Sequence, residues 1–216
     1  MIEYVSTGVM CVKKIDIDLD KLSNDTLSLI ALESDDIEVL YMLYQIGLER
    51  DCKDILVSIL KNCRVETKET VGLIEEYARK EYEIEESDGK RLSEKYSEVT
   101  YDKNLKEYLA VNPYTSVDTL IDMLVYGEIT PLLNSSMPND TLNAYIVSSS
   151  SIPIIQNNPE LIEKLLNTLS YKLSDETLVY LGKVPFEMSS CDVNQMATQA
   201  IERRISFRAG IQKVKK

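Results

Sequence analysis

The 216-residue sequence contains no histidine and no tryptophan, and it has only two phenylalanines and seven glycines. Without histidine the chain cannot build a Ser-His-Asp or Cys-His catalytic group, nor a zinc site of the HExxH type. The seven glycines are scattered and form no phosphate-binding loop. These absences exclude much common enzymology, although catalysis by lysine, tyrosine or carboxylate side chains stays open. We therefore expect a protein without enzymatic activity and without a cofactor.

The sequence also lacks long apolar runs and closely spaced cysteines. No segment approaches the roughly 18 to 20 apolar residues needed to cross a bilayer, and the first residues lack the basic-then-apolar order of a secretion signal. The four cysteines, at positions 11, 52, 63 and 191, form no CxxC pair, so we expect buried free thiols instead of a zinc or redox site. The sequence predicts a cytoplasmic protein with no membrane partner, located in the host cytoplasm if the source is a virus.

Charge is distributed unevenly along the chain. The net charge is -12, but residues 201–216 hold six basic residues against one acidic residue, so the rest of the chain carries -17. The acidic part is expected to repel nucleic acid and anionic surfaces, which only the basic tail could bind. The tail could dock on a partner protein, on RNA or on an anionic membrane, or it could pack as the last helix. The candidate partner-binding residues are Arg203, Arg204, Arg208, Lys213, Lys215 and Lys216.

A short pattern, Ser/Thr-x-Asp/Glu-Thr-Leu/Val, recurs along the chain. It starts at Ser23, Thr67, Ser116 and Ser174, with a looser copy at Pro138. A Ser or Thr hydroxyl can cap the free N–H groups of a helix start, and an acidic residue in the first turn suits the helix dipole. Apolar residues then follow at helical spacing in most copies. Each copy therefore predicts the start of a helix.

Additional helices fit between these starts. Ser34 is expected to cap one helix, and Pro159 to lie in the first turn of another. After Ser116, the expected buried stripe is Val117, Leu120, Ile121, Leu124 and Val125; after Ser34 it is Ile37, Leu40, Tyr41 and Tyr44. Glu75 and Gly182 interrupt the stripes of two other copies. The sequence predicts an all-α fold of stacked short antiparallel helices, similar to an α-solenoid, while a non-repetitive helical domain is the alternative.

Residues 109–124, LAVNPYTSVDTLIDML, carry a longer motif. They resemble the variant leucine-rich repeat, a HEAT-like helical repeat with the approximate signature Leu-Ala-x-Asn-Pro-x-Thr-Pro followed by Leu-x-x-Leu. The matching residues are Leu109, Ala110, Asn112, Pro113, Thr115, Leu120 and Leu124. Ser116 stands where the family usually has proline. The resemblance implies an α-solenoid-like fold and a protein-binding role, whereas the family's N-terminal metal cluster is not supported by the cysteine spacing.

The remaining segments complete the expected organisation. Ala197, Ile201, Ile205 and Ala209 predict an apolar stripe on a C-terminal helix that stops at Gly210. Strand-like residues around Gly8 predict a short hairpin or an extended arm. The expected divisions are an N-terminal arm or hairpin at 1–20, a first helical subdomain at 21–80, a polar linker or turn at 81–102, a second helical subdomain at 103–200, and a basic C-terminal helix or tail at 201–216.

Two acidic groups are further candidate sites. Asp16, Asp18 and Asp20 alternate, so on a strand they would share a face and could hold a divalent metal; the alternative is a solvated acidic face. A second group could dock a basic partner or simply be solvated: Glu81, Glu83, Glu85 and Glu86.

The leading functional hypothesis is a helical-repeat protein–protein interaction module. A composition rich in Asn, Ile, Lys and Tyr is typical of an AT-rich genome and favours a bacteriophage accessory or host-modulating protein. One alternative is a structural subunit of a virion or another large assembly. The other is an enzyme that uses carboxylates or a metal.

Overall fold

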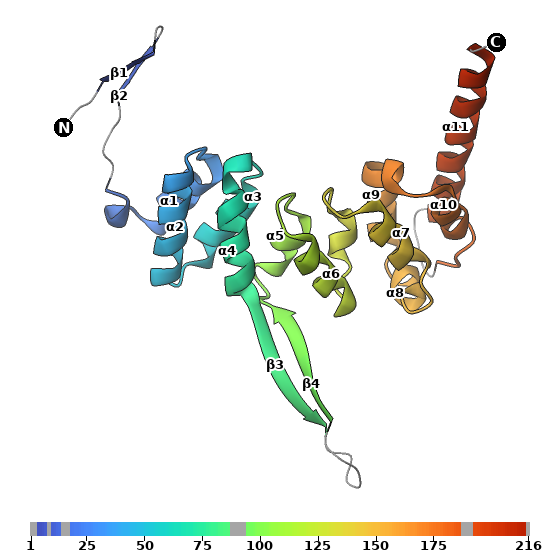
Figure 1. Ribbon diagram of the computed structural model, residues 1–216, viewed down its shortest axis with the longest axis horizontal. Coiled ribbons are helices and arrows are strands. Elements are labelled where there is room, and N and C mark those ends of the chain that lie inside the picture. The colour runs from blue at the N-terminus through green and yellow to red at the C-terminus, as the bar shows by residue number, and fades with distance from the viewer. Residues whose placement is uncertain (1–3, 8–9, 14–17, 87–93, 187–191, 215–216) are drawn as a thin grey trace. The chain divides into compact units, whose positions relative to one another are not determined.

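The computed structural model describes residues 4–7, 10–13, 18–86, 94–186 and 192–214, with side chains at 18–80, 99–186 and 192–211. Helices dominate these residues, and the strands form two antiparallel hairpins (Figure 1). The predicted all-α fold of stacked short helices is therefore confirmed. In the described part of the chain, every helix is too short or too polar to cross a membrane. The chain divides into two compact units, Met1–Thr70 and Val71–Lys216, so the boundary falls within one helix.

The first unit begins with a hairpin and continues as short helices. The hairpin pairs two four-residue strands, which is one of the two forms expected for the N-terminal segment. The elements of this unit are β1 Tyr4–Thr7, β2 Met10–Lys13, the 3-10 helix η1 Leu19–Lys21, α1 Asn24–Glu33, α2 Ile37–Glu49, α3 Lys53–Lys61, the 3-10 helix η2 Val65–Thr67 and the start of α4 Lys68–Ala78.

In the first unit α3 packs against both α1 and α2. Leu27 of α1 and Leu40 of α2 are buried, as are Ile55 and Ile59 of α3. The expected stripe of α2 was wrong at two positions, because Ile37 and Tyr41 are exposed while Leu43 and Ile46 are buried. Helical spacing is compatible with either set of residues, and packing against α3 determines which face of α2 is buried.

Two predicted features of this unit needed correction. Ser34 ends α1, while Asp36 caps α2 through hydrogen bonds from the backbone N–H groups of Glu38 and Val39. The cysteines are not uniformly buried, since Cys63 is exposed and Cys52 is half-buried. The side chains of the other two cysteines, at positions 11 and 191, lie outside the described set.

The second unit contains the remainder of α4, a long hairpin and a series of helices. Its elements after α4 are β3 Arg79–Glu86, β4 Glu94–Tyr101, α5 Lys106–Val111, α6 Val117–Val125, the 3-10 helix η3 Thr130–Leu133, α7 Asn139–Val147, α8 Ile152–Gln156, α9 Pro159–Leu169, the 3-10 helix η4 Ser170–Lys172, α10 Asp175–Leu181 and α11 Val193–Val214. The segment expected to be a polar linker at 81–102 thus forms most of a hairpin. The expected stop at Gly210 was also wrong, because α11 continues to Val214.

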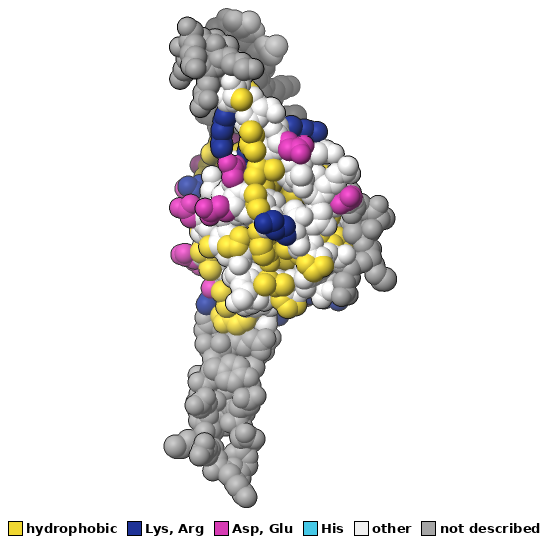
Figure 2. Space-filling model, turned by 90° about the vertical axis from the view of Figure 1, so that its right-hand side faces the viewer, with side chains coloured by type: hydrophobic (Ala, Val, Ile, Leu, Met, Phe, Trp, Pro, Cys, Tyr) yellow, Lys and Arg dark blue, Asp and Glu magenta, His cyan; other side chains and the backbone are white. Residues whose placement is uncertain are grey.

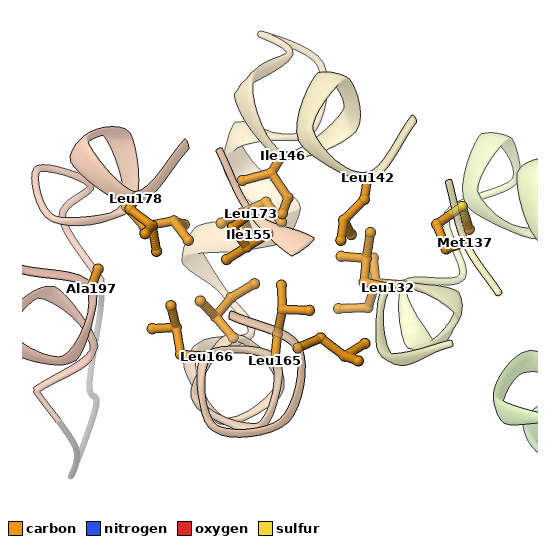
Figure 3. Close-up of a cluster of buried hydrophobic side chains, with 14 of the residues drawn as sticks. Leu132, Met137, Leu142, Ile146, Ile155, Leu165, Leu166, Leu173, Leu178 and Ala197 are labelled. Carbon is orange, nitrogen blue, oxygen red and sulfur yellow. The ribbon is translucent and has the colours of Figure 1, made fainter. Parts of the chain in front are cut away.

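Successive helices of the second unit lie side by side. One row runs α5, η3, α9 and α11, and on another side α7 lies beside α10. Buried side chains from α6 to α11 meet in one hydrophobic cluster, which Figure 3 shows for residues that include Leu132, Leu142, Leu165 and Ala197. Helix α10 approaches α11 closely at Gly182, where a Cβ would lie 3.3 Å from the Thr198 hydroxyl oxygen. This approach explains why a glycine interrupts the stripe of that copy.

The recurring Ser caps are confirmed at Ser23, Ser116 and Ser174, whose hydroxyls each accept a hydrogen bond from the N–H three residues later. At Thr67 a helix does begin, but the hydroxyl donates to the carbonyls of Asn62 and Arg64 instead. The stripe of α6 was wrong at Val125, which is 71% exposed, while Met123 is buried.

Candidate protein-binding site

A buried asparagine joins successive helices of the second unit. Asn134 follows η3, and its side-chain amide donates to the carbonyls of Ala110 (3.0 Å) and Asn112 (2.8 Å) at the end of α5. Its side-chain oxygen accepts a hydrogen bond from the N–H of Ser136 at 2.8 Å. Carbonyls at a helix end have no partner within the helix, so a buried amide that binds two of them stabilises the junction. We call this arrangement an asparagine joint.

The first unit contains the same asparagine joint. Asn62 follows α3, and its amide donates to the carbonyls of Ala31 (2.9 Å) and Ser34 (2.7 Å) at the end of α1. Its side-chain oxygen accepts from the N–H of Arg64 at 3.3 Å. The two units therefore use one device, in which each helix end is bonded to the end of an earlier helix.

The residues of the longer sequence motif have structural roles. Leu109, Leu120 and Leu124 are buried. The Thr115 hydroxyl donates to the carbonyl of Leu109 at 2.7 Å, and the Asn112 side-chain oxygen accepts from the N–H of Tyr114. The motif thus builds the turn between α5 and α6 and leaves no polar group free for a ligand. Membership of the variant leucine-rich repeat family stays a prediction.

Glu75 of α4 provides another link between helices, because it binds the start of α6. Its carboxylate accepts hydrogen bonds from the N–H of Ser116 (2.8 Å) and from the hydroxyls of Ser116 and Thr119 (both 2.6 Å). The residue is buried, so these bonds compensate for the loss of water around the charge. The acidic residue that interrupted the predicted stripe therefore connects α4 to α6.

The expected metal ligands are not arranged as expected. Asp18 precedes η1 and Asp20 lies within it, so they do not continue strand β2, and both are exposed. Asp18 instead pairs with Lys21 at 2.7 Å. Asp16 lies outside the described residues. Among those that are described, no group of three or more acidic, cysteine or histidine residues could hold a metal ion.

The acidic candidates Glu81, Glu83, Glu85 and Glu86 all lie in strand β3. In the ladder with β4 they pair in turn with Val99, Ser97, Lys95 and Glu94. The first three occupy alternate positions, and Glu86 belongs to the other set of alternate positions. The four glutamates therefore do not share one set of alternate positions in the ladder.

The basic candidates on α11 differ in whether they bind other residues of the fold. Arg204 donates to the carbonyls of Ser170 and Leu173 and pairs with the Asp175 carboxylate at 3.1 Å, while Arg208 binds the other Asp175 oxygen at 2.6 Å. These hydrogen bonds, first from Arg208 and then from Arg204, lower the pKa of Asp175 below its ordinary value. Two of the six basic residues predicted to bind a partner thus pair within the fold.

Arg203 has a different environment. Its side chain is exposed, and no ion pair or hydrogen bond involves it within the described chain. The side chains of Lys213, Lys215 and Lys216 fall outside the described set. Among the basic residues of α11 whose side chains are described, Arg203 is the one available to a partner.

Large apolar side chains of α11 are also exposed. Ile205, Phe207 and Ile211 are 57%, 70% and 41% exposed, although Ala197, earlier on the helix, is buried. Figure 2 views the side on which α11 lies in Figure 1, and hydrophobic side chains form a narrow column there beside acidic and basic groups. Residues 203, 207 and 211 lie on one side of the helix, whereas Ile205 lies on another. We call residues 203, 207 and 211 the outer face of α11.

The outer face continues a groove between α9 and α11. The groove has a volume of about 340 Å³ and is lined on α11 by residues that include Met196, Ala200 and Arg203. Phe207 follows Ala200 by seven residues and precedes Ile211 by four, a spacing that places all three on one side of a helix. The groove and the outer face thus form one continuous surface.

A larger cavity of about 580 Å³ lies between η3 and the start of α9. Its lining includes Thr130, Asn158, Glu160 and Lys164, which carry one acidic and one basic group between them. The Asn158 amide is already bonded to the carbonyl of Ile154 at 2.8 Å. The acidic and the basic group of this cavity balance each other, whereas the α11 groove includes the unpaired Arg203.

Sequence reasoning identified the basic residues of this site but missed its apolar part. Ile205 was assigned to a packing stripe, and Phe207 lies outside that stripe. A signal was present, because Met196, Ala200, Phe207 and Ile211 also have helical spacing. Packing against one side of a helix buries only one of its two apolar stripes, so the other stays accessible.

Comparison of the chain with protein-family models, with curated protein sequences and with solved structures finds no match in any of the three. The assignment of function therefore depends on the geometry of the chain itself.

Proposed function

We propose that the chain is a non-enzymatic protein-binding module of the helical-repeat type, and that the outer face of α11 is its docking surface. The observation that supports this proposal is the exposure of Phe207 and Ile211 beside the unpaired Arg203. Adjacent exposed apolar residues with polar neighbours often mark interaction sites, and aromatic residues and arginine are enriched there.

The energetics favour a partner on this face. Burying one large apolar side chain contributes about 1.5 to 3 kcal/mol, and two such groups on this face, Phe207 and Ile211, are exposed. An isolated helix shorter than about 12 residues is marginal in water, yet α11 continues to Val214, past Arg208, which pairs with Asp175 of α10. A partner that covers the outer face would bury the apolar side chains and stabilise the end of the helix.

The apolar content also distinguishes between partner classes. Nucleic-acid binding depends on several free cationic groups, whereas Asp175 neutralises part of the charge of Arg204 and Arg208. Phe207 and Ile211 would gain little from a phosphate backbone. A protein surface that combines apolar and acidic groups fits this face better than RNA or an anionic membrane.

A photocrosslinking amino acid placed at position 207 tests the docking surface. We expect covalent adducts with a partner in an extract of the source organism or with added copies of the chain. The matched control carries the same group at Val125, which is similarly exposed on α6, and should give no adduct. Equal adducts at both positions, or none at either, would contradict the assignment of the site.

A second candidate function is a structural subunit of a large assembly. The specific observation in its favour is the β3–β4 hairpin, whose two eight-residue strands pair only with each other in the described chain. Isolated two-stranded hairpins are marginally stable, and their open edges can pair with other chains. Light scattering decides this point, because a subunit should form particles larger than a dimer. Origin in a bacteriophage stays a prediction from composition.

A further inference from the structure

Helix α2 of the first unit exposes large apolar side chains. Ile37, Tyr41 and Met42 are 42%, 51% and 49% exposed, whereas Leu40 and Leu43 of the same helix are fully buried. Successive residues of an α-helix are about 100° apart, so the three exposed residues fall within about 140° of the helix surface. One side of α2 therefore packs in the core of the unit, and the other presents apolar groups to solvent.

The exposed side of α2 also carries negative charge. Glu38 and Glu49 are both exposed, and around the helix axis both positions fall between Tyr41 and Met42. Helix α2 contains no basic residue. We call residues 37, 38, 41, 42 and 49 the acidic face of α2. It combines the apolar and acidic groups that the outer face of α11 requires.

The residues of the two faces follow one another in the same order. Phe207 lies about one helical turn after Arg203 on α11, and Met42 lies about one turn after Glu38 on α2. Two helices that run parallel with Arg203 beside Glu38 therefore bring Phe207 beside Met42. Ile211 then lies about 12 Å beyond Arg203, within the length of α2. A single alignment thus matches both the charges and the apolar groups.

We infer that the partner is a second copy of the chain, whose α2 lies parallel to α11 with its acidic face against the outer face. This inference rests on the function proposed above and names its partner. Residues 201–216 hold six basic residues and one acidic residue, whereas the remainder of the chain carries -17. Attraction between unlike patches steers association and fixes orientation. Each copy therefore supplies both halves of the contact.

The expected affinity follows from the size of the contact. One helix against one helix buries less than the standard interface of about 1,600 Å², so we expect micromolar association. Sedimentation of the full chain from about 1 to 200 µM covers this range. The average mass should rise above that of one chain as the concentration increases.

Two charge-reversal variants test the two sides of the contact. Arg203→Glu changes α11, and Glu38→Lys changes α2. Each should weaken self-association at least about tenfold. The matched control for the second is Asp54→Lys, because Asp54 is also an exposed acidic residue in the first turn of a helix, so the effect on the helix dipole is similar. This control should associate like the wild type, and circular dichroism should show unchanged helical content in all three variants.

Mixing the two variants gives the decisive result. The altered α11 of one variant meets the altered α2 of the other, so unlike charges face each other again, and the unaltered α2 and α11 also match. The mixture should therefore associate about as tightly as the wild type. If Arg203→Glu dissociates but Glu38→Lys associates normally, α11 contacts a different surface of the second copy, and the inference is wrong.

The photocrosslinker at position 207 locates the contact directly. With purified chain alone, we expect adducts that mass spectrometry maps to residues 37–49 of a second copy. Adducts that map to another segment would overturn the inference, as would a wild-type chain that stays monomeric at 200 µM. The proposed function would survive either result if the crosslinker captured a different protein in an extract. Absence of any adduct at position 207 would instead remove the docking surface itself.

Discussion

Helix α11 has two halves that contain similar residues in different environments. Ala197 is buried and Ile201 is half-buried, while the corresponding residues of the second half, Ile205 and Ala209, are exposed. In Figure 1 the second half extends beyond α9 and α10. The comparison shows that an apolar stripe is buried, and so stabilises the fold, only where neighbouring helices lie beside it. Beyond that point the same residue types become available for binding.

The largest expected effect comes from placing a carboxylate in the first half. Ala197→Glu would bury a charged and oversized side chain in the cluster of Figure 3, which we expect to cost more than about 3 kcal/mol of unfolding free energy. Ala209→Glu is the matched change in the exposed half and should stay within about 0.5 kcal/mol. Chemical denaturation of both variants measures the difference. Similar losses would show that the second half is packed.

The next effect concerns the attachment of α11 to α10. Asn194 donates to the carbonyls of Leu181 (2.9 Å) and Val184 (2.8 Å). Asn194→Ala would leave both acceptors without this donor and should cost about 1 to 3 kcal/mol. Gln195→Ala, at the adjacent exposed position, is the control and should be nearly neutral. If the two variants unfold alike in denaturant, the asparagine contributes little.

Adjacent arginines provide a third comparison. Arg204→Met removes hydrogen bonds to two carbonyls and to Asp175, so we expect a loss of about 1 to 2 kcal/mol. Arg203→Met should leave the melting temperature unchanged but weaken association with a partner. Melting curves and sedimentation of both variants separate folding from binding. A melting temperature lowered equally by both changes would contradict this division.

A smaller effect should appear with pH. Because hydrogen bonds from Arg208 and Arg204 lower the pKa of Asp175 in the folded chain, their contribution is present above its unfolded pKa and is lost as pH falls through the lower folded value. The wild type should therefore lose melting temperature more steeply than Asp175→Asn as pH falls below about 4. Parallel curves would indicate that this group is not linked to folding.

The smallest effect on stability is expected at the outer face. Phe207→Ser removes an aromatic ring that is 70% exposed, and serine has a similar helix propensity, so melting should change little. Association with a partner should nevertheless weaken about tenfold or more. Val125→Ser is the control for both measurements. Loss of melting temperature without loss of association would assign Phe207 to folding.

Local interactions were predictable from the sequence, and distant ones were not. The caps at Ser116 and Ser174 depend on residues three positions away, so a short pattern reveals them. The bonds from Asn62 and Asn134 reach carbonyls more than twenty residues earlier, and nothing local identifies those partners. Glu75 appeared as an interruption of a stripe because its partners, Ser116 and Thr119, are equally distant.

The two missed elements have related explanations. The β3–β4 segment contains alternating Tyr and Ile residues, but its many charged residues favoured a linker, and pairing of the strands outweighed that composition. On α11 the sequence gives the spacing of Ile201 and Ile205 but not the lengths of the neighbouring helices. Which part of a stripe becomes a binding site is therefore a property of the assembled fold.

The base of the β3–β4 hairpin has a consequence for how the chain can evolve. The N–H of Asp102 donates to the carbonyl of Ala78 at 2.8 Å, so the chain leaves α4 and returns towards α5 at nearly the same point. An insertion whose ends meet can be lengthened, shortened or exchanged while the helices on either side keep their bonds. The hairpin is thus a replaceable insert between α4 and α5, and exchanging this segment should leave the helices on either side intact.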